Sequence, residues 1–379
     1  MLQTSCFVSR SAEEIKDSIL NTTAFRPTLG IIFSSVRLGI PELTRTASSF
    51  GIPVFGCSTA GEILATPEGP PVYEQSAVCC LLDLPASFFS VKLFERDKES
   101  CFAFGQRIGA WGMEVFSKPA FIITVAGLEN DGEAIIRGME AICPEGTMIY
   151  GGLAGDDGLL KETFVFSHTG HSSDGAVVTV FDQSKVTVRG IATSGWTGVG
   201  AEMVITSSEG NVVSTINGRP ALDVVREYLN VSDEEVLQIA VNFPLLIKRA
   251  DGTEVLRTIF AADYNKRSVT FAGTVPNGAR VRFSSSFGYE TIEQAIRDLR
   301  DYFPRQTDAD LVLIFSCMAR FRAAGPMVND EIMAASQLWK RPLIGFFTYG
   351  EIGHNRYGTC EFYNESLSLV LIHIRPGPV

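Results

Sequence analysis

The alternation of apolar and polar positions predicts short buried strands separated by amphipathic helices. An apolar run at 29–36 fits a buried strand, and Pro41 suits the first turn of a helix that ends near Phe50. A second apolar run at 53–57 ends in glycine and small polar residues. Strand, helix, strand and glycine-rich turn together describe one αβ unit.

The same order recurs near the other end of the chain. The sequence predicts a strand at 311–320, a helix at 329–340 and a further strand at 342–346. The stretch IPVFGCSTAGEI at 52–63 also aligns without a gap with RPLIGFFTYGEI at 341–352. This self-similarity indicates an internal duplication.

A weaker third copy lies between these two. An apolar run at 121–128 precedes a helical pattern at 132–142 and the glycine-rich turn GGLAGDDG at 151–158. The predicted fold class is α/β, of the mixed α+β kind, with two domains whose mixed sheets are related by internal duplication. Since 379 residues exceed the size of a typical single core, we expect domains at 1–215 and 216–379.

Composition narrows the range of partners. The formal net charge is −11, which argues against nucleic acid or an anionic membrane surface as a partner, and the basic pair Lys248-Arg249 is interpreted as solvated surface. No apolar run approaches the ~20 residues of a membrane span, and the N-terminus lacks a secretory pattern, so we expect a cytoplasmic protein. The eight cysteines include no CxxC pair and are expected to be reduced, with no metal site.

The glycine-rich turns are the candidate ligand site. Glycine permits close backbone approach, so these turns can present N–H groups to a ligand, or they can pack tightly where the copies face each other. The carboxylates that follow the glycines can bind a ligand or cap their own turns. We expect a pocket between the two halves, lined by Gly56, Cys57, Ser58, Thr59, Gly61, Glu62, Gly151, Gly152, Asp156, Asp157, Ser316, Cys317, Arg320, Thr348, Tyr349, Gly350 and Glu351.

Arg320 is the candidate partner for a ligand carboxylate, because its planar guanidinium can bind a carboxylate with two hydrogen bonds. The alternative role is an ion pair with Glu62 or Glu351. Both interpretations place Arg320 near the repeated turns.

Catalysis is considered through the cysteines. Cys57 and Cys317 are the candidate nucleophiles, and His354 is the histidine that can approach Cys57 if the copies face each other. His168 and His171 lie in a polar turn sequence instead. Because no nucleophile-elbow or zincin motif is present, we expect no enzyme activity, and a cysteine-dependent hydrolase is the alternative.

Several motifs in order resemble the FIST family of sensory domains over nearly the whole chain. The matching stretches are GCSTAGEI (56–63), GGLAGDDG (151–158), GNVVSTINGRPALDVVREYL (210–229), LIFSCMAR (313–320), GFFTYGEIG (345–353) and FYNESLSLVLI (362–372). The resemblance implies paired N-terminal and C-terminal FIST domains that sense small ligands, amino acids being suggested, in bacterial signal transduction. It also implies action through a separate partner such as a histidine kinase or a cyclic-dinucleotide enzyme.

A subset of similar stand-alone proteins binds heme and reports nitric oxide to a histidine kinase. For this alternative the candidate heme ligand is His354, since Phe346, Phe347, Tyr349 and Tyr357 surround it in sequence. Any heme would be noncovalent, because no CxxCH motif exists. An aromatic core beside a surface histidine explains the same pattern.

Overall fold

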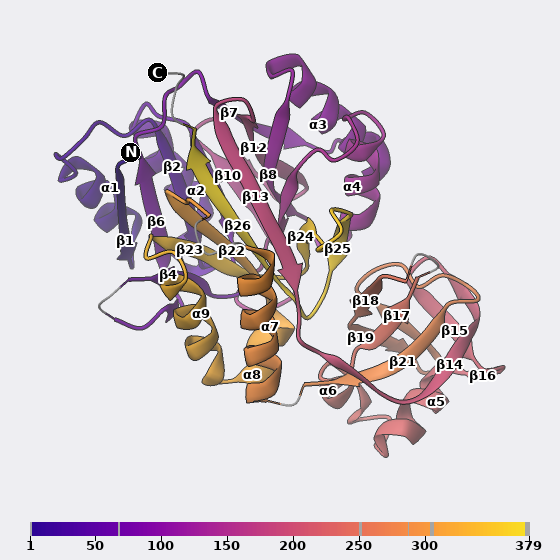
Figure 1. Cartoon of the computed structure of the whole chain (residues 1–379). Helices are drawn as coiled ribbons and strands as arrows, with labels where there is room; N and C mark the ends of the chain where they lie inside the picture. The colour runs from indigo at the N-terminus through magenta and orange to yellow at the C-terminus, as the bar shows by residue number, and fades with distance from the viewer. Residues whose placement is uncertain (1, 67–68, 250–251, 287, 304–306, 376–379) are drawn as a thin grey trace.

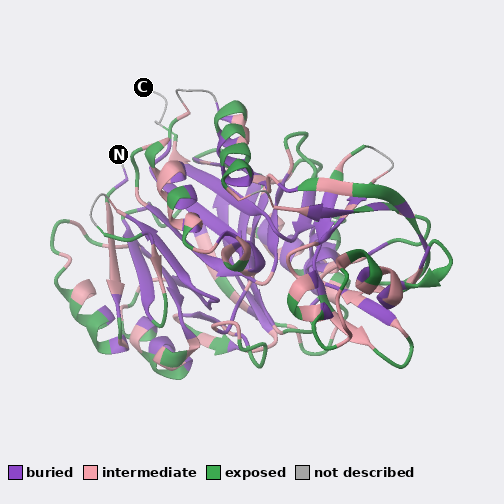
Figure 2. Cartoon of the chain, turned by 90° about the horizontal axis from the view of Figure 1, so that it is seen from below, coloured by how far each residue is buried: buried purple, intermediate pink, exposed green. Residues whose placement is uncertain are grey.

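The computed structural model describes residues 2–66, 69–249, 252–286, 288–303 and 307–375. They form two bodies of unequal size (Figure 1). The larger one, here called the core body, contains three six-stranded sheets covered by helices, and the smaller one holds a separate antiparallel sheet. Figure 2 shows that the sheets of the core body are mostly buried, whereas its helices expose their outer faces.

The core body consists of three units with the same order of elements. The first contains β1 (Thr4–Ser9), α1 (Ala12–Leu20), β2 (Leu29–Ser34), the 3-10 turn η1 (Val36–Leu38), α2 (Ile40–Ser49), β3 (Val54–Ser58), β4 (Glu62–Ala65), β5 (Val72–Tyr73) and β6 (Ala77–Leu82). Its central strands β2 and β3 are parallel, and β6 and β1 extend the sheet on one side in antiparallel pairings. Pro41 lies in the first turn of α2, as predicted.

The second and third units repeat this plan. The second contains β7 (Phe89–Glu95), α3 (Cys101–Val115), β8 (Pro119–Ala126), α4 (Gly132–Glu140), β9 (Ile149–Leu153), β10 (Val165–Ser167), β11 (Gly170–Ser172) and β12 (Gly175–Asp182). The third contains β13 (Val186–Thr193), α7 (Tyr289–Tyr302), β22 (Leu311–Cys317), α8 (Met318–Ala324), α9 (Met327–Gln337), β23 (Leu343–Thr348), β24 (Glu351–His354), β25 (Cys360–Tyr363) and β26 (Leu367–Ile374).

Each unit extends a hairpin into the sheet of another unit. β4 of the first unit pairs with β23, β24 of the third pairs with β9, and β10 of the second pairs with β3. The exchange closes a ring of three sheets around one apolar core, in which the rings of Phe33 and Phe346 lie 4.7 Å apart. The predicted duplication is therefore confirmed, and the third copy has the same plan as the other two.

The smaller body, here called the inserted domain (residues 197–285), interrupts the third unit. It contains β14 (Thr197–Glu209), β15 (Val212–Ile216), β16 (Arg219–Pro220), α5 (Ala221–Leu229), α6 (Val236–Ala240), β17 (Leu245–Lys248), β18 (Glu254–Arg257), β19 (Ile259–Asp263), β20 (Ser268–Phe271) and β21 (Arg280–Ser285). It has its own core, which includes Leu222 and Phe283. The mixed α+β class with two domains is confirmed, while the boundary at residue 215 stays a prediction.

Among the predicted elements that differ in extent from the structure, two have a clear local cause. The strand expected over 311–320 ends at Cys317, because helix α8 begins at Met318 with Cys317 as its N-cap. The helix expected at 329–340 spans Met327–Gln337, since the chain already turns at Pro326. Within the described ranges, every helix is too short or too polar to span a bilayer.

Candidate functional site

The three glycine turns (59–61, 154–164 and 349–350) meet at one end of the core body. Each follows the second parallel strand of its unit and leads into the exchanged hairpin. Backbone hydrogen bonds join them in all three pairings: Ala60 N to Phe347 O at 2.9 Å, Leu153 N to Gly350 O at 2.9 Å, and Gly155 N to Ser58 O at 3.0 Å. The three turns therefore converge, as the sequence suggests.

Glu62 is fully engaged in its own turn. Thr59 Oγ1 donates to Glu62 Oε1 at 2.5 Å, and the Ser76 hydroxyl and amide donate to Oε2 at 2.8 and 3.2 Å. Burial raises the pKa of Glu62 to about 7. Its carboxyl group joins the start of β4 to the start of β6.

Glu351 repeats this arrangement in the third unit. Thr348 Oγ1 donates to Glu351 Oε1 at 2.5 Å, and the Ser366 hydroxyl and amide donate to Oε2 at 2.8 and 3.3 Å. Complete burial raises the pKa of Glu351 to about 8. Both repeated glutamates thus use their oxygens within the fold, which matches the capping role considered from the sequence.

The glycines of the repeat serve close packing. A Cβ at Gly345 would overlap the carbonyl oxygen of Ile314, and one at Gly151 would overlap that of Ile123, because both glycines lie against a parallel neighbouring strand. The Phe362 ring fills the space beside Gly350. Close approach of backbone and rings, rather than of a ligand, therefore accounts for these glycines. The other glycines of the predicted site are packed in the same way: Gly56 against Phe166, Gly61 against Phe347, and Gly152 against Thr348.

The acidic pair of the second unit takes two different roles. Asp156 is buried and accepts hydrogen bonds from the amides of Leu160, Lys161 and Glu162 at 2.9, 2.6 and 3.0 Å. The Tyr349 hydroxyl also donates to Asp156. These contacts fold the longer turn of the second unit into a closed loop.

Asp157 is more open than its neighbour. Ser35 Oγ donates to Asp157 Oδ2 at 2.8 Å, and Arg37 Nε lies 3.7 Å from the same oxygen. Partial burial raises the pKa of Asp157. Of the predicted acidic residues, it is the one that retains contact with solvent.

Arg320 forms an ion pair inside the protein. Arg320 Nε donates to Glu331 Oε2 at 2.9 Å, a second nitrogen donates to Oε1, and both side chains are 1% exposed. The guanidinium carbon lies 5.1 Å from the ring centre of Trp196. Its partner is thus Glu331, one helix further along the chain, and not Glu62 or Glu351.

The candidate nucleophiles lie in unreactive surroundings. Cys57 and Cys317 are buried, and burial raises the pKa of both thiols well above the ordinary value, so the thiolate is disfavoured. Ser316, beside Cys317, is buried as well. His354 forms its hydrogen bonds with the backbone and not with Cys57.

His354 uses both of its ring nitrogens within the fold. The amide of Ile149 donates to Nε2 at 3.1 Å, and Nδ1 lies 2.9 Å from the carbonyl oxygen of Gly358, to which it donates in the matching tautomer. Burial lowers the pKa of His354, and the Tyr150 ring lies 5.0 Å away. An axial heme ligand needs a nitrogen free to bind iron, so this residue does not fit a heme site.

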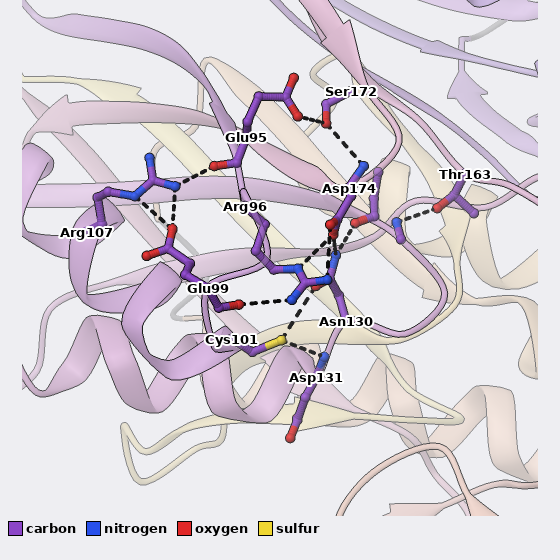
Figure 3. A network of polar contacts seen from close by, with 12 residues as sticks. Glu95, Arg96, Glu99, Cys101, Arg107, Asn130, Asp131, Thr163, Ser172 and Asp174 are labelled. Atoms are coloured by element: carbon purple, nitrogen blue, oxygen red, sulfur yellow. Dashed lines mark hydrogen bonds and ion pairs between the residues drawn. The ribbon is translucent and has the colours of Figure 1, made fainter.

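A further polar network fixes the second unit (Figure 3). Arg96 at the end of β7 pairs with Asp174 before β12 at 2.7 Å, and the Asn130 amide donates to the same carboxylate at 3.2 Å. Arg107 on α3 binds Glu99. Because these groups satisfy one another, the network holds helices α3 and α4 against the sheet rather than offering a site.

An open cleft lies elsewhere, between helix α4 of the core body and the inserted domain. It has a volume of about 670 Å³, within the range of small-molecule pockets. Its walls come from α4 on one side and from β14, β17, β18 and the segment before β21 on the other. The lining residues are Glu133, Arg137, Glu202, Ile247, Lys248, Arg249, Val255, Thr274, Pro276, Asn277, Gly278, Ala279 and Arg280.

Glu133 of α4 lines this cleft and contacts the inserted domain. Its Oε2 lies 3.2 Å from Nη2 of the fully buried Arg257 and accepts from the Thr274 amide at 3.3 Å. Its Oε1 binds Arg137 and lies 3.9 Å from Arg249. Glu133 is thus an ionic contact between the two bodies.

A second contact of the same kind involves Arg249, which pairs with Glu361 of β25 in the core body. Arg257 also donates to the Phe362 carbonyl oxygen at 2.9 Å. Arginines of the inserted domain are therefore held by carboxyl and carbonyl oxygens of the core body. This group of contacts (Glu133, Arg249, Arg257 and Glu361) is called the interdomain latch below.

Sequence reasoning missed the cleft. Its lining residues lie outside the glycine turns, and its walls are distant in sequence. The one available signal was the pair Lys248-Arg249, which was interpreted as solvated surface. A second hollow of about 710 Å³, beside β1 and α1, is lined by hydroxyl, amide and apolar groups, including Thr4, Asn21 and Phe25, without a charged side chain.

Comparison with known proteins assigns the chain to a family. The FIST N domain matches residues 28–219 and the FIST C domain matches residues 221–354, so the chain belongs to the FIST family. FIST domains are sensory domains that bind small ligands in signal transduction. Two uncharacterized proteins from Mycobacterium tuberculosis strains CDC 1551 and H37Rv are each 25% identical to it over 178 residues. The aligned segment covers 43% of this chain and 45% of the length of each relative.

Proposed function

We propose that this chain is a cytoplasmic sensory protein that binds a small ligand in the interdomain cleft without turning it over. The observation that carries this proposal is the open cleft of about 670 Å³, whose two walls belong to two different bodies. A ligand that contacts both walls binds one relative orientation of the bodies better than others, and so shifts their equilibrium. A change in ligand concentration then changes the relative orientation of the two bodies, which a partner protein can recognise.

The connections between the bodies are compatible with such a movement. The chain passes between them at the β13–β14 and β21–α7 crossings. Gly195 in the first crossing has φ +77° and packs against the backbone of Thr291, whereas Gly288 beside the second has φ +63° and only the Met327 methyl group nearby. Glycine is well suited to hinge positions because it adopts backbone angles that other residues avoid.

The output is proposed to pass to a separate protein, a histidine kinase or a cyclic-dinucleotide enzyme, as the family resemblance implies. Binding without turnover is supported by the raised pKa of the Cys57 and Cys317 thiols, which opposes nucleophilic chemistry. We do not propose nitric-oxide sensing through heme, since both ring nitrogens of His354 are hydrogen-bonded to the backbone. Ligand contact at the glycine turns stays a prediction that the experiment below distinguishes from binding in the cleft.

The test is a thermal-shift screen of the full chain against amino acids, organic acids and nucleotides. A ligand at 100 times its Kd stabilises the folded state by ~2.7 kcal/mol. The shift should shrink in Arg137→Gln, which changes the cleft wall, and persist in Arg45→Gln, an exposed arginine on α2. A ligand whose shift is equal in both variants binds elsewhere and contradicts the proposed site. Turnover that depends on Cys57 or Cys317 would instead support the hydrolase alternative.

A further inference from the structure

We propose that the ligand of the cleft is a small oxyanion carrying two or more negative charges, and that it binds in competition with the interdomain latch. This inference rests on the proposed function and specifies its ligand class. It follows from the charges of the cleft wall, from two like charges placed side by side, and from the partners of Arg249.

The cleft wall carries more positive than negative side chains. Its lining residues include two carboxylates, Glu133 and Glu202, and four cations: Arg137, Lys248, Arg249 and Arg280. The chain as a whole has a net charge of −11, so the charge of the cleft wall is opposite in sign to that of the chain. A concave wall with an excess of two cations over carboxylates raises the local concentration of anionic ligands.

Two of these cations stand directly opposite each other on neighbouring strands. Lys248 of β17 and Arg280 of β21 are cross-strand partners, and both are exposed. Like charges in this position destabilise a sheet. Among the described residues Lys248 makes no ion pair, although Glu254 is its partner on the other side, while Arg280 pairs with Glu202 at 2.9 Å. An anion between Lys248 and Arg280 would relieve their repulsion.

The arginines of the cleft wall indicate the chemical class of the ligand. A planar guanidinium binds carboxylate and phosphate oxygens with two parallel hydrogen bonds, and three of the four cations are arginines. A volume of about 670 Å³ admits a metabolite but no polymer. Polycarboxylates and phosphate compounds share the required chemistry, so the experiment includes one probe of each kind.

Binding of such an anion competes with contacts between the two bodies. Arg249 currently pairs with Glu361 and lies 3.9 Å from Glu133, both in the core body. An anion in the cleft offers Arg249 another partner, which weakens the hold of the core body on the inserted domain. The ligand therefore loosens the latch as it binds, and this links occupancy to the orientation of the inserted domain.

Isothermal titration of the full chain with citrate and with pyrophosphate tests the proposal, with acetate and chloride at equal ionic strength as controls. We expect saturable binding of at least one multivalent probe and no saturable binding of either control. Lys248→Gln should weaken binding about tenfold, the typical effect of losing one charged contact. Arg45→Gln should leave binding unchanged.

The competition with the latch is tested by Glu361→Gln, which frees Arg249 from its carboxylate and should strengthen binding of the probe. A pair of surface variants with opposite expected effects tests the charge of the cleft wall. Arg280→Gln should weaken binding of the probe, whereas Glu202→Gln should strengthen it, because it frees Arg280 from its carboxylate. Both positions are on the surface, so both variants should fold. Equal affinity in Lys248→Gln, Arg280→Gln and the wild type would overturn the proposal.

The failure of this inference is distinguishable from the failure of the proposed function. A neutral or cationic compound from the screen that loses its thermal shift in Arg137→Gln would show a ligand in the cleft and overturn only the anionic class. Anion binding that Arg137→Gln, Lys248→Gln and Arg280→Gln leave intact would overturn this inference alone, whereas a screen in which every ligand keeps its thermal shift in Arg137→Gln would overturn the proposed function. The probe that binds more tightly, citrate or pyrophosphate, indicates whether carboxylate or phosphate is the natural group.

Discussion

Replacing Glu331 with glutamine should destabilise the protein strongly, although it changes one atom of the side chain and keeps its volume. The carboxylate holds Arg320 through two hydrogen bonds, and both side chains are 1% exposed. Glutamine offers a single acceptor oxygen and no charge. Arg320 would keep its contacts with the Ser194 carbonyl oxygen and the Trp196 ring, but its charge would lie in the interior without its hydrogen-bonded counter-ion.

The expected magnitude follows from this burial. Removing one partner of a buried ion pair costs ~3–5 kcal/mol, mainly because the remaining charge has lost its compensation. An unfolding entropy of ~2.1 cal/mol/K per residue gives about 0.8 kcal/mol/K for 379 residues. A loss of ~4 kcal/mol therefore lowers Tm by about 5 °C.

Urea denaturation followed by circular dichroism, together with calorimetry, measures the effect. The matched control is Glu293→Gln on α7, whose pair with Arg297 has side chains 61% and 52% exposed and should contribute less than about 0.5 kcal/mol. The double variant Arg320→Met, Glu331→Leu should lose less stability than Glu331→Gln, because no unpaired charge remains. If Glu331→Gln costs no more than Glu293→Gln, the description of Arg320 as a buried structural cation is wrong.

Three further results are expected. Burial raises the pKa of Glu62 to about 7 and that of Glu351 to about 8, from an ordinary 4.5. Between pH 4.5 and its raised pKa, each group binds more protons in the folded state than in the unfolded state. Stability should therefore fall as pH rises from about 5 to 8, and Glu351→Gln should flatten the plot of Tm against pH; an unchanged slope would contradict this. Gly345→Ala should cost more than ~3 kcal/mol or prevent folding, because its Cβ would overlap a backbone carbonyl, whereas Gly170→Ala meets only a Leu93 methyl group at 3.5 Å and should be tolerated. His354→Ala should lower Tm through two lost hydrogen bonds, and the wild type mixed with hemin should show no specific Soret shift; hemin uptake that depends on His354 would overturn the structural role.

The αβ units could be predicted because their signals are local. Buried parallel strands such as β2 and β22 appear as continuous apolar runs, and the helices between them have a regular apolar face. The exchange of hairpins could not be predicted in this way, because the pairing of β4 with β23 joins residues near opposite ends of the chain. The insertion of a domain into the third unit also gives no local signal in the sequence, since the strands on either side have the usual apolar pattern of buried strands.

In the candidate site, too, local features could be predicted from the sequence, whereas contacts between distant segments could not. The sequence indicated correctly that the glycine turns converge, because repeated units place equivalent turns together. It did not show that Thr59 and Ser76 already occupy the oxygens of Glu62, since that depends on where β6 begins. The cleft depends on how α4 and β17 lie relative to each other, which local sequence patterns do not indicate. Its only signal in the sequence was the basic pair Lys248-Arg249.

Hydrogen–deuterium exchange of the full chain, with and without the best ligand from the thermal-shift screen, tests the central claim most directly. If the ligand binds in the interdomain cleft, exchange should slow in α4, in β17 and in the segment 274–280, which form the two walls. The glycine turns should exchange equally slowly in both samples, because they are already closed by hydrogen bonds. Slower exchange confined to the glycine turns, with α4 and β17 unchanged, would contradict the account and place the ligand where the repeated turns meet.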